Sequence, residues 1–280
     1  MKKILLLLTA LLGAAQILFA QNSGRTTIDS LPEIQIGAQS DIHLISPEPI
    51  QYADISSHSI VGDMPVKNLL RIKLVPDSLR NLQKDCTGLG VITIVGESFI
   101  AQYRLVFTNS PGQQMPSAIA IQPEQCRPLE FPGISLTTPQ MKAYAMDVLH
   151  RGKKSDIRNA KAYGLTAILN HVYTVGDHVF LDVSFRNKTN LAYDIDELRF
   201  KIEDKKITKA TNVQSLEIKP EWQLYQQPSF KKEYHNIYVF KKVTFPDNKI
   251  LNVELSEKQV SGRTLTLQIK YGDLLKADNL

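Results

Sequence analysis

Residues 166–187, TAILNHVYTVGDHVFLDVSFRN, decide the fold class of this chain. In the second half of the stretch apolar and polar side chains alternate, with Val179, Leu181, Val183 and Phe185 set against Asp182, Ser184 and Arg186. A period of two is typical of a β-strand with one buried face. Gly176-Asp177 joins this strand to the apolar run at residues 166–175. The stretch therefore predicts two consecutive strands separated by a turn.

Strand-like runs continue on both sides of this stretch. They lie at residues 42–45, 50–55, 66–75, 91–95 and 99–108 before it, and at residues 198–202, 237–245, 250–255 and 264–271 after it. Turn residues separate the runs, among them Gly62-Asp63 and the predicted hairpin turn Pro246-Asp247-Asn248. Several short strands at this spacing predict an antiparallel sandwich or barrel.

One segment has a helical period instead. Thr138 is a good N-cap and Pro139 suits the first helical position. Apolar residues then recur at spacings of three and four, at Met141, Tyr144, Ala145, Val148 and Leu149. A basic cluster follows, made of His150, Arg151, Lys153, Lys154, Arg158 and Lys161. This cluster is either a solvated linker or a docking surface for an acidic partner.

These patterns predict a mainly β chain with two antiparallel β-sandwich-like domains, joined by a loop and a short α-helix. Residues 110–136 are rich in Pro, Gln and Gly, as expected of a long loop or a domain boundary. The expected organisation is a signal peptide at 1–20, a flexible lead-in at 21–40, an N-terminal β domain at 41–135, a helical linker at 136–162 and a C-terminal β-sandwich at 163–280.

The first 20 residues, MKKILLLLTALLGAAQILFA, have the layout of a secretory signal peptide. Lys2 and Lys3 precede an apolar run, and cleavage is expected near Ala20 and Gln21. Removal of this segment lowers the net charge from +5 to +3, which is well short of the dense basic face of a nucleic-acid binder. The first cysteine lies far from the cleavage point, so a lipid anchor is not expected. We therefore predict export to the periplasm.

Export places the two cysteines, Cys86 and Cys126, in an oxidising compartment where a disulfide can persist. A bridge between them would close a loop of about 41 residues, which is worth roughly 4 kcal/mol in the chain-entropy model. Two separate free thiols are the alternative, and the sequence leaves both open.

No motif in the chain points to catalysis. None of the six histidines lies in an H-E-x-x-H pattern, and neither a G-x-S-x-G elbow nor a P-loop is present. His171 and His178 flank one predicted turn and could approach each other there. We expect no catalytic residue, no metal site, no cofactor and no small-molecule substrate.

Aromatic residues gather in one stretch and are interleaved with lysines. They are Trp222, Tyr225, Phe230, Tyr234 and Tyr238. Such rings are enriched at the centres of protein interfaces, so they are candidate partner contacts. Alternatively, about half of them fill the core of the second domain.

Two long strings resemble the TraN family of Bacteroides-type conjugative transposons. They are ISPEPIQYADISSHSIVGDMPVKNLLRIK at residues 45–73 and NIYVFKKVTFPDNKILNVELSEKQVSGRTLTLQIKYGDLL at residues 236–275. The resemblance implies a non-enzymatic structural subunit of a conjugative type IV secretion apparatus, assembled in the outer-membrane core complex. It implies other Tra proteins as partners, a homo-oligomeric ring and membrane association through those partners. Direct contact with nucleic acid is not expected, because the mature charge is small and no nucleic-acid-binding motif is present.

Two other classes of function fit the same sequence features. A secreted β-sandwich binding or adhesion module for a glycan or a protein would present a solvent-facing aromatic platform. A periplasmic hydrolase would present a deep pocket with convergent carboxylates or a Ser/His pair.

Overall fold

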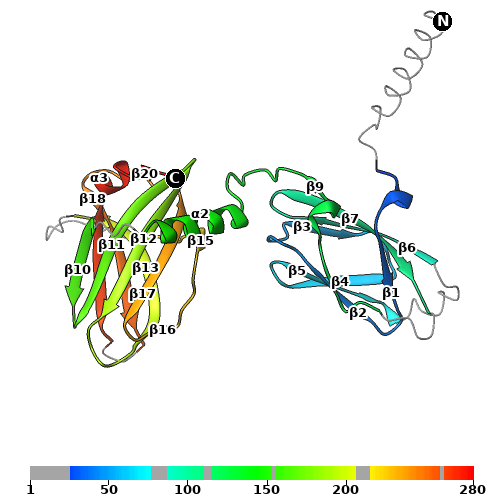
Figure 1. The fold of residues 1–280 in the computed structure, drawn as a ribbon, viewed down its shortest axis with the longest axis horizontal. Helices are drawn as coiled ribbons and strands as arrows, with labels where there is room; N and C mark the ends of the chain where they lie inside the picture. The colour runs from blue at the N-terminus through cyan, green and yellow to red at the C-terminus, as the bar shows by residue number, and fades with distance from the viewer. Residues whose placement is uncertain (1–25, 77–86, 110–114, 153–155, 206–214, 259–261) are drawn as a thin grey trace, which may run out of the picture. The chain divides into compact units, whose positions relative to one another are not determined.

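The computed structural model describes residues 26–76, 87–109, 115–152, 156–205, 215–258 and 262–280. These residues form two compact units, one ending at Phe131 and the other beginning at Pro132. Strands dominate both units (Figure 1), which confirms the predicted mainly β fold class. Cys86 and the predicted signal peptide lie outside the described residues.

The first unit contains two sheets that share one core. One sheet has the order β1 (Glu33–Ile36), β7 (Phe99–Phe107), β6 (Thr87–Val95) and β3 (Tyr52–Ile55), with β9 (Cys126–Pro128) also paired to β7. The other has the order β4 (Ile60–Val66), β5 (Leu69–Leu74), β2 (Asp41–Ile45) and β8 (Ala118–Ala120). Alternate side chains of both sheets meet in one buried cluster, which includes Ile36, Leu44, Ile72, Ile92 and Tyr103. The period of two in these strands therefore fills the core.

Three expectations for this unit are wrong. The lead-in at 21–40 is not flexible throughout, because β1 pairs in parallel with β7 and buries Ile34 and Ile36. Gly62-Asp63 is not a turn but lies within β4. Residues 110–136 are not one long loop, since β8 pairs with β2 and β9 pairs with β7. In each case a strand of three to seven residues gains stability from its partner strand rather than from its own propensity.

The second unit also packs two sheets face to face. The helix-covered sheet has the order β10 (Arg158–Ala162), β11 (Leu165–Val175), β12 (His178–Asn187), β17 (Glu233–Lys241) and β15 (Trp222–Gln223), and β20 (Asp278–Asn279) pairs with β11. The opposing sheet has the order β14 (Leu216–Ile218), β13 (Tyr193–Asp204), β18 (Lys249–Glu257) and β19 (Thr264–Lys270), and β16 (Ser229–Phe230) pairs with β13. A five-residue helix, α3 (Tyr271–Leu275), follows β19.

The inward faces of these two sheets form the main core. Leu181, Val183 and Phe185 of β12 meet Phe200 and Val253 of the opposing sheet there. The alternation at residues 179–185 and 198–202 thus predicted the inner faces correctly. The predicted hairpin at Pro246-Asp247-Asn248 is wrong, because β17 and β18 belong to different sheets and these residues connect them.

The predicted helix forms but is not a linker. It is α2 (Thr138–Arg151), with Thr137 rather than Thr138 at the N-cap, where Thr137 N–H donates to Gln140 Oε1 at 2.9 Å. The helix ends at Gly152, whose φ of 63° suits a glycine C-cap. Its apolar face packs against the outer face of the helix-covered sheet, where Met141, Ala145 and Val148 meet Tyr173, Phe180, Ile237 and Val239. Residues 138–151 therefore belong to the core of the second unit.

Because of α2, β12 is buried on both faces, which corrects the expectation of a half-buried strand. Asp182 and Ser184 are buried with the apolar residues. Asn170 Nδ2 donates to Asp182 Oδ1 at 2.8 Å and to Ser184 Oγ at 2.6 Å. His235 Nε2 lies 2.5 Å from the same Asp182 oxygen. Hydrogen bonds within the sheet thus satisfy polar groups that water cannot reach.

A bidentate ion pair joins the end of β18 to the start of β19. Arg263 Nε donates to Glu257 Oε2 at 2.8 Å, and Arg263 Nη2 donates to Glu257 Oε1 at 2.6 Å. The guanidinium also lies over the ring of the buried Tyr193, 5.2 Å from its centroid. The Arg263 hydrogen bonds lower the pKa of the Glu257 carboxyl below its ordinary value of 4.5. The ionised pair therefore stabilises the folded chain.

Replacing Glu257 by Gln should reduce the free energy of unfolding by about 2–4 kcal/mol at pH 7, because Arg263 loses its partner in a largely buried site. Since folding lowers the pKa of this carboxyl, its contribution is full above pH 4.5 and disappears as the pH falls through the folded-state pKa. The difference between the two chains should therefore shrink below pH 4.5. Urea unfolding followed by the fluorescence of Trp222, the single tryptophan, measures this. The matched control is Glu254→Gln in the more exposed pair with Lys201, where we expect less than about 1 kcal/mol.

Replacing Ala145 by Arg tests the place of α2. A linker helix would tolerate the change. The completely buried Ala145 leaves no room for a charged side chain, so we expect a loss of at least about 3 kcal/mol or failure of the second unit to fold. Lys142→Ala on the exposed face of the same helix should change stability by less than about 0.5 kcal/mol. Similar unfolding midpoints for the two variants would contradict the packing of α2.

Candidate functional site

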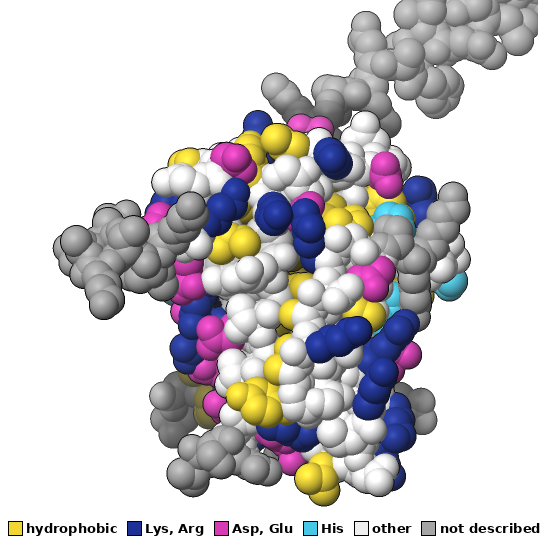
Figure 2. All heavy atoms as spheres, turned by 90° about the vertical axis from the view of Figure 1, so that its left-hand side faces the viewer, with side chains coloured by type: hydrophobic (Ala, Val, Ile, Leu, Met, Phe, Trp, Pro, Cys, Tyr) yellow, Lys and Arg dark blue, Asp and Glu magenta, His cyan; other side chains and the backbone are white. Residues whose placement is uncertain are grey.

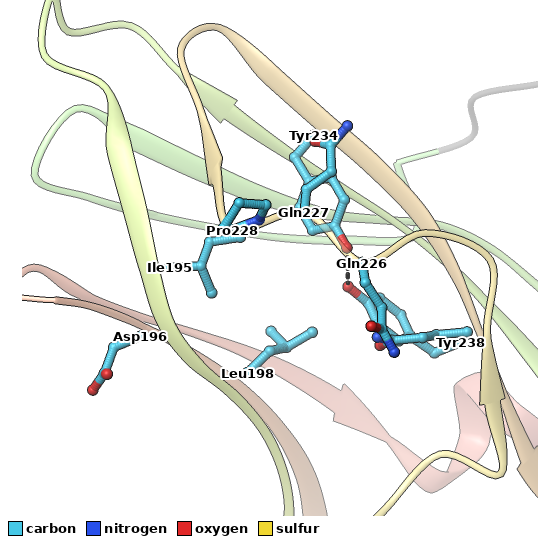
Figure 3. A pocket seen from close by; sticks show the side chains of 9 residues that line it. Ile195, Asp196, Leu198, Gln226, Gln227, Pro228, Tyr234 and Tyr238 are labelled. Atoms are coloured by element: carbon cyan, nitrogen blue, oxygen red, sulfur yellow. Dashed lines mark hydrogen bonds between the residues drawn. The ribbon is translucent and has the colours of Figure 1, made fainter. Parts of the chain in front are cut away.

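A cavity of about 480 Å³ opens at one edge of the second unit and is called the edge pocket below. Its lining residues come from both sheets and from the chain between them: Ile195, Asp196, Leu198, Gln223, Gln226, Gln227, Pro228, Tyr234 and Tyr238. On the other side of the sandwich β10 lies against β19, so the two sheets meet there. The edge pocket forms where the sheets separate (Figure 3).

The edge pocket exists because one stretch of chain leaves one sheet for the other. β14 and β16 both pair antiparallel with the same edge of β13. Between them, residues 219–228 cross to the helix-covered sheet, where Trp222 and Gln223 of β15 pair with Val239 and Tyr238. These ten residues, called the excursion below, form one wall of the edge pocket. The other wall is β13.

A β-bulge shapes the β13 wall. The register of β13 against β18 shifts between Ile195 and Glu197. Ile195 and Leu198 are three positions apart and would point to opposite faces of a regular strand. The bulge turns both toward the hollow, while the carboxylate of Asp196 points away from it (Figure 3). The β13 wall is therefore apolar on its inner side.

Asn236 holds the excursion in place. Its Oδ1 accepts hydrogen bonds from the N–H groups of Tyr225 and Ile237, at 2.9 Å and 3.0 Å. Its Nδ2 donates to the carbonyl of Tyr225 at 2.9 Å and to the hydroxyl of Tyr234 at 2.7 Å. Asn236 is completely buried and uses its full hydrogen-bonding capacity in these four contacts. The side chain acts on Tyr225 as a neighbouring strand would.

Two tyrosine hydroxyls lie at the base of the edge pocket. Tyr238 donates to the hydroxyl of Tyr234 at 3.4 Å, and Tyr234 donates to the carbonyl of Tyr225 at 3.2 Å. Burial raises the pKa of Tyr234, and it raises the pKa of Tyr238 well above its ordinary value of 10. Both hydroxyls therefore stay neutral across the physiological range. Their hydrogen bonds are already made within the protein, so the three Gln amides are the uncharged groups of the edge pocket that can bond to a ligand.

Of the two readings of the aromatic stretch, the structure favours the core for most of the rings. Phe230, Tyr234 and Tyr238 are buried in the main core, and Trp222 is half-buried beside α2. Only Tyr225 of the five is exposed. The neighbouring lysines lie in pairs before and at the end of β17 and are exposed, while the rings within the strand point into the core. The sequence signal for the edge pocket was weaker than that of the aromatic stretch. It consists of several Gln residues between the two segments that pair with β13.

Among the described residues, the histidines and the basic cluster form no separate site, and Lys153 and Lys154 of that cluster lie outside those residues. His171 lies opposite Asp182 rather than near His178, and His178 contacts Asp177 and Glu221, each at 3.0 Å. Across the described parts of the chain, no group of three or more His, Cys, Asp or Glu residues could hold a metal ion.

Within the basic cluster, Arg151 pairs with Asp147 and Arg158 pairs with Asp273. Figure 2 shows basic, acidic and apolar side chains intermixed on the face that it displays. These contacts favour a solvated surface over a docking site for an acidic partner.

The cysteine prediction stays open, since Cys86 lies outside the described residues. Cys126 is half-buried, and its thiol donates to the carbonyl of Gln122 at 3.4 Å. Burial raises the pKa of this thiol. No helix among the described residues has the length and apolarity needed to cross a membrane.

Comparison with known proteins adds one finding. Residues 139–279, half of the chain, match the model of a family described as a domain of unknown function, DUF4138. The match runs from the start of α2 to β20 and so covers the whole second unit apart from a few residues at its ends. It includes the edge pocket and the second of the two strings quoted above. No curated protein matches the chain.

Replacing Asn236 by Leu, which has nearly the same shape, should release the excursion. Four buried hydrogen bonds are lost and the N–H and C=O of Tyr225 lose their partner, so we expect a loss of about 2–4 kcal/mol. Amide exchange at Tyr225 should accelerate before the strands of the core open. Asn159→Ala, which removes one exposed hydrogen bond to Asp156, is the control and should cost less than about 0.5 kcal/mol. Unchanged protection at Tyr225 would contradict the role of Asn236.

Proposed function

The chain belongs to the DUF4138 family, and we propose that it is an exported structural subunit of a conjugative type IV secretion apparatus, of the TraN kind. It has no catalytic role in this proposal. It assembles with other Tra proteins in the outer-membrane core complex, reaches the membrane through those partners and can form a homo-oligomeric ring. The strings at residues 45–73 and 236–275 support the choice of apparatus, and the leader at residues 1–20 supports export to the periplasm.

The observation that carries the assembly role is the surface around β4. Among the described residues β4 pairs with β5 alone, so its other edge is free. Val61, Met64 and Val66 of this strand are 45%, 49% and 55% exposed. Apolar side chains gathered on a free sheet edge are a binding surface or an aggregation hazard.

Val66 continues into an apolar row across the sheet. It lies opposite Leu69 of β5, which lies opposite Ile45 of β2. Side chains opposite one another share a face, and Ile45 is also exposed. The row and the β4 side chains together are called the β4 surface below. It is the kind of apolar patch that a partner subunit covers.

Two features of β4 limit uncontrolled strand pairing. Pro65 has no N–H to donate to a further strand, and Asp63 is held in a bidentate pair with Arg71, with contacts of 2.9 Å and 2.8 Å. A Pro and a fixed charge are two of the devices by which proteins protect free edges. Contact through the exposed apolar side chains on either side of this ion pair stays available. A surface of this kind suits a specific subunit interface better than open-ended edge pairing.

The edge pocket supports a second candidate, a secreted binding module that acts outside any conjugation apparatus. Its Gln amides could bind a glycan or a protein. An aromatic platform of the five rings does not support it, because three of them are in the core. The two candidates differ in the partners that purify with the chain.

Substitution on the β4 surface tests the assembly role. In cells that carry the whole conjugative element, the tagged chain should recover other Tra proteins from the envelope, and its deletion should abolish DNA transfer. Val61→Lys with Val66→Lys should lower both recovery and transfer at least about tenfold, because charge replaces apolar contact area. The unfolding midpoint should not change, since both side chains are exposed. Leu191→Lys, at a position that is 72% exposed in the second unit, is the control and should have no effect. Recovery of the chain alone, with normal DNA transfer after deletion, would refute the proposal.

A further inference from the structure

The strand pairing of the opposing sheet is interrupted at the edge pocket. On the edge of β13 that faces away from β18, Phe200 lies opposite Ile218 of β14, and Asp194 lies opposite Ser229 of β16. Ile195 N–H still donates to the carbonyl of Pro228, at 2.8 Å. From Asp196 to Arg199 no strand of the described chain pairs with this edge. The gap is about four residues, or about 13 Å, long.

We propose that an extended segment of a partner polypeptide fills this gap, pairing with β13 between β14 and β16 through main-chain hydrogen bonds. A strand edge presents N–H and C=O groups in a row, and another extended chain matches that row. The same edge already accepts an antiparallel segment on each side of the gap. The added strand would continue an existing pairing pattern.

The edge pocket would receive the side chains of the added strand. Alternate side chains of a strand point to one face, and here that face meets Ile195, Leu198 and Pro228 (Figure 3). The volume of about 480 Å³ lies within the range of about 300–1,000 Å³ that is usual for ligand sites. Gln226 and Gln227 stand at the rim, where their amides can bond to polar groups of the segment. The pocket therefore favours small or apolar side chains against Ile195, Leu198 and Pro228 and polar ones beside the Gln amides.

A polypeptide fits the site better than a glycan does. Sugar rings commonly stack on exposed aromatic faces, but Tyr234 and Tyr238 are almost completely buried and offer only their hydroxyl ends. The row of N–H and C=O groups on the edge of β13 can pair with the main chain of another polypeptide, and a glycan has no such main chain. Asp196 points away from the hollow, so no charge is needed on the segment (Figure 3).

The chain's own excursion is held away from the gap. Asn236 fixes Tyr225, and the β15 pairing fixes Trp222 and Gln223 against β17. For residues 219–228 to pair with β13 instead, these contacts would have to break. The site is thus preorganised for a separate segment, which lowers the cost of binding.

This inference rests on the proposed function only for the identity of the partner, which would be another Tra subunit. Binding itself is tested with purified components. The probe is a phage-displayed library of random heptapeptides, selected on the full chain without residues 1–20, and the selected peptides are then synthesised. We expect peptides with dissociation constants below about 100 µM. On their addition, those amides of residues 196–199 that face away from β18 should become protected from hydrogen exchange, which a ligand held by side chains alone would not cause.

The test variant is Ile195→Arg, which places a charge in the hollow, and the matched control is Leu191→Arg on an exposed site nearby in the sequence. We expect Ile195→Arg to weaken peptide binding at least about tenfold and Leu191→Arg to leave it unchanged. Trp222 fluorescence reports whether each variant folds. The exchange experiment on the unaltered chain decides the question even if Ile195→Arg does not fold.

Three results would overturn the inference: no selected peptide below that dissociation constant, protection that appears only outside residues 193–204, or peptide binding that a folded Ile195→Arg chain retains in full. Glycan binding without peptide binding also overturns it. If peptides bind as expected but no Tra protein purifies with the chain, strand addition stands and the conjugation role falls. If Tra proteins purify with the chain but no peptide binds, the conjugation role stands and strand addition falls.

Discussion

Burial of both faces of the helix-covered sheet is the constraint on which the second unit depends. One face packs on the opposing sheet and the other on α2. A sheet covered on both sides has no wet face for its polar residues, so Asp182, Ser184 and Asn170 must bond to one another. The same constraint removes α2 from any role as a spacer between two domains. It also fixes the position of β17, from which Asn236 and the two tyrosines build the edge pocket.

The edge pocket is a consequence of how the sandwich ends. On one side the sheets meet through β10 and β19. On the other, residues 216–230 are shared between the sheets: β14 pairs with β13, β15 with β17, and β16 with β13 again. Where this stretch of chain pairs with one sheet, it leaves the edge of the other sheet unpaired. The incompleteness is stable because Asn236 supplies the hydrogen bonds that a further strand would have made to Tyr225.

The two surfaces proposed for binding differ in physical type. The β4 surface is an apolar face whose strand edge is protected by Pro65 and Asp63. The gap in β13 is an open stretch of strand edge beside a pocket lined by apolar side chains of β13 and by Gln amides. The first suits contact with a preformed subunit, and the second suits a linear segment.

The sequence by itself determined the fold class, the inner faces of most strands and the position of α2, because these depend on local periods of 2 and 3.6. It also left the aromatic stretch open between core and surface, and the structure places three of the five rings in the core. Only the tertiary structure decided which sheet α2 covers on its outer face and that β17 and β18 lie in different sheets. It alone also decided that residues 219–228 cross from one sheet to the other. The physical reason is that pairing and burial join residues far apart in the chain, such as Tyr225 with Asn236 or Ile34 with Leu105. No local pattern records such partners, so the edge pocket could not be read from the sequence.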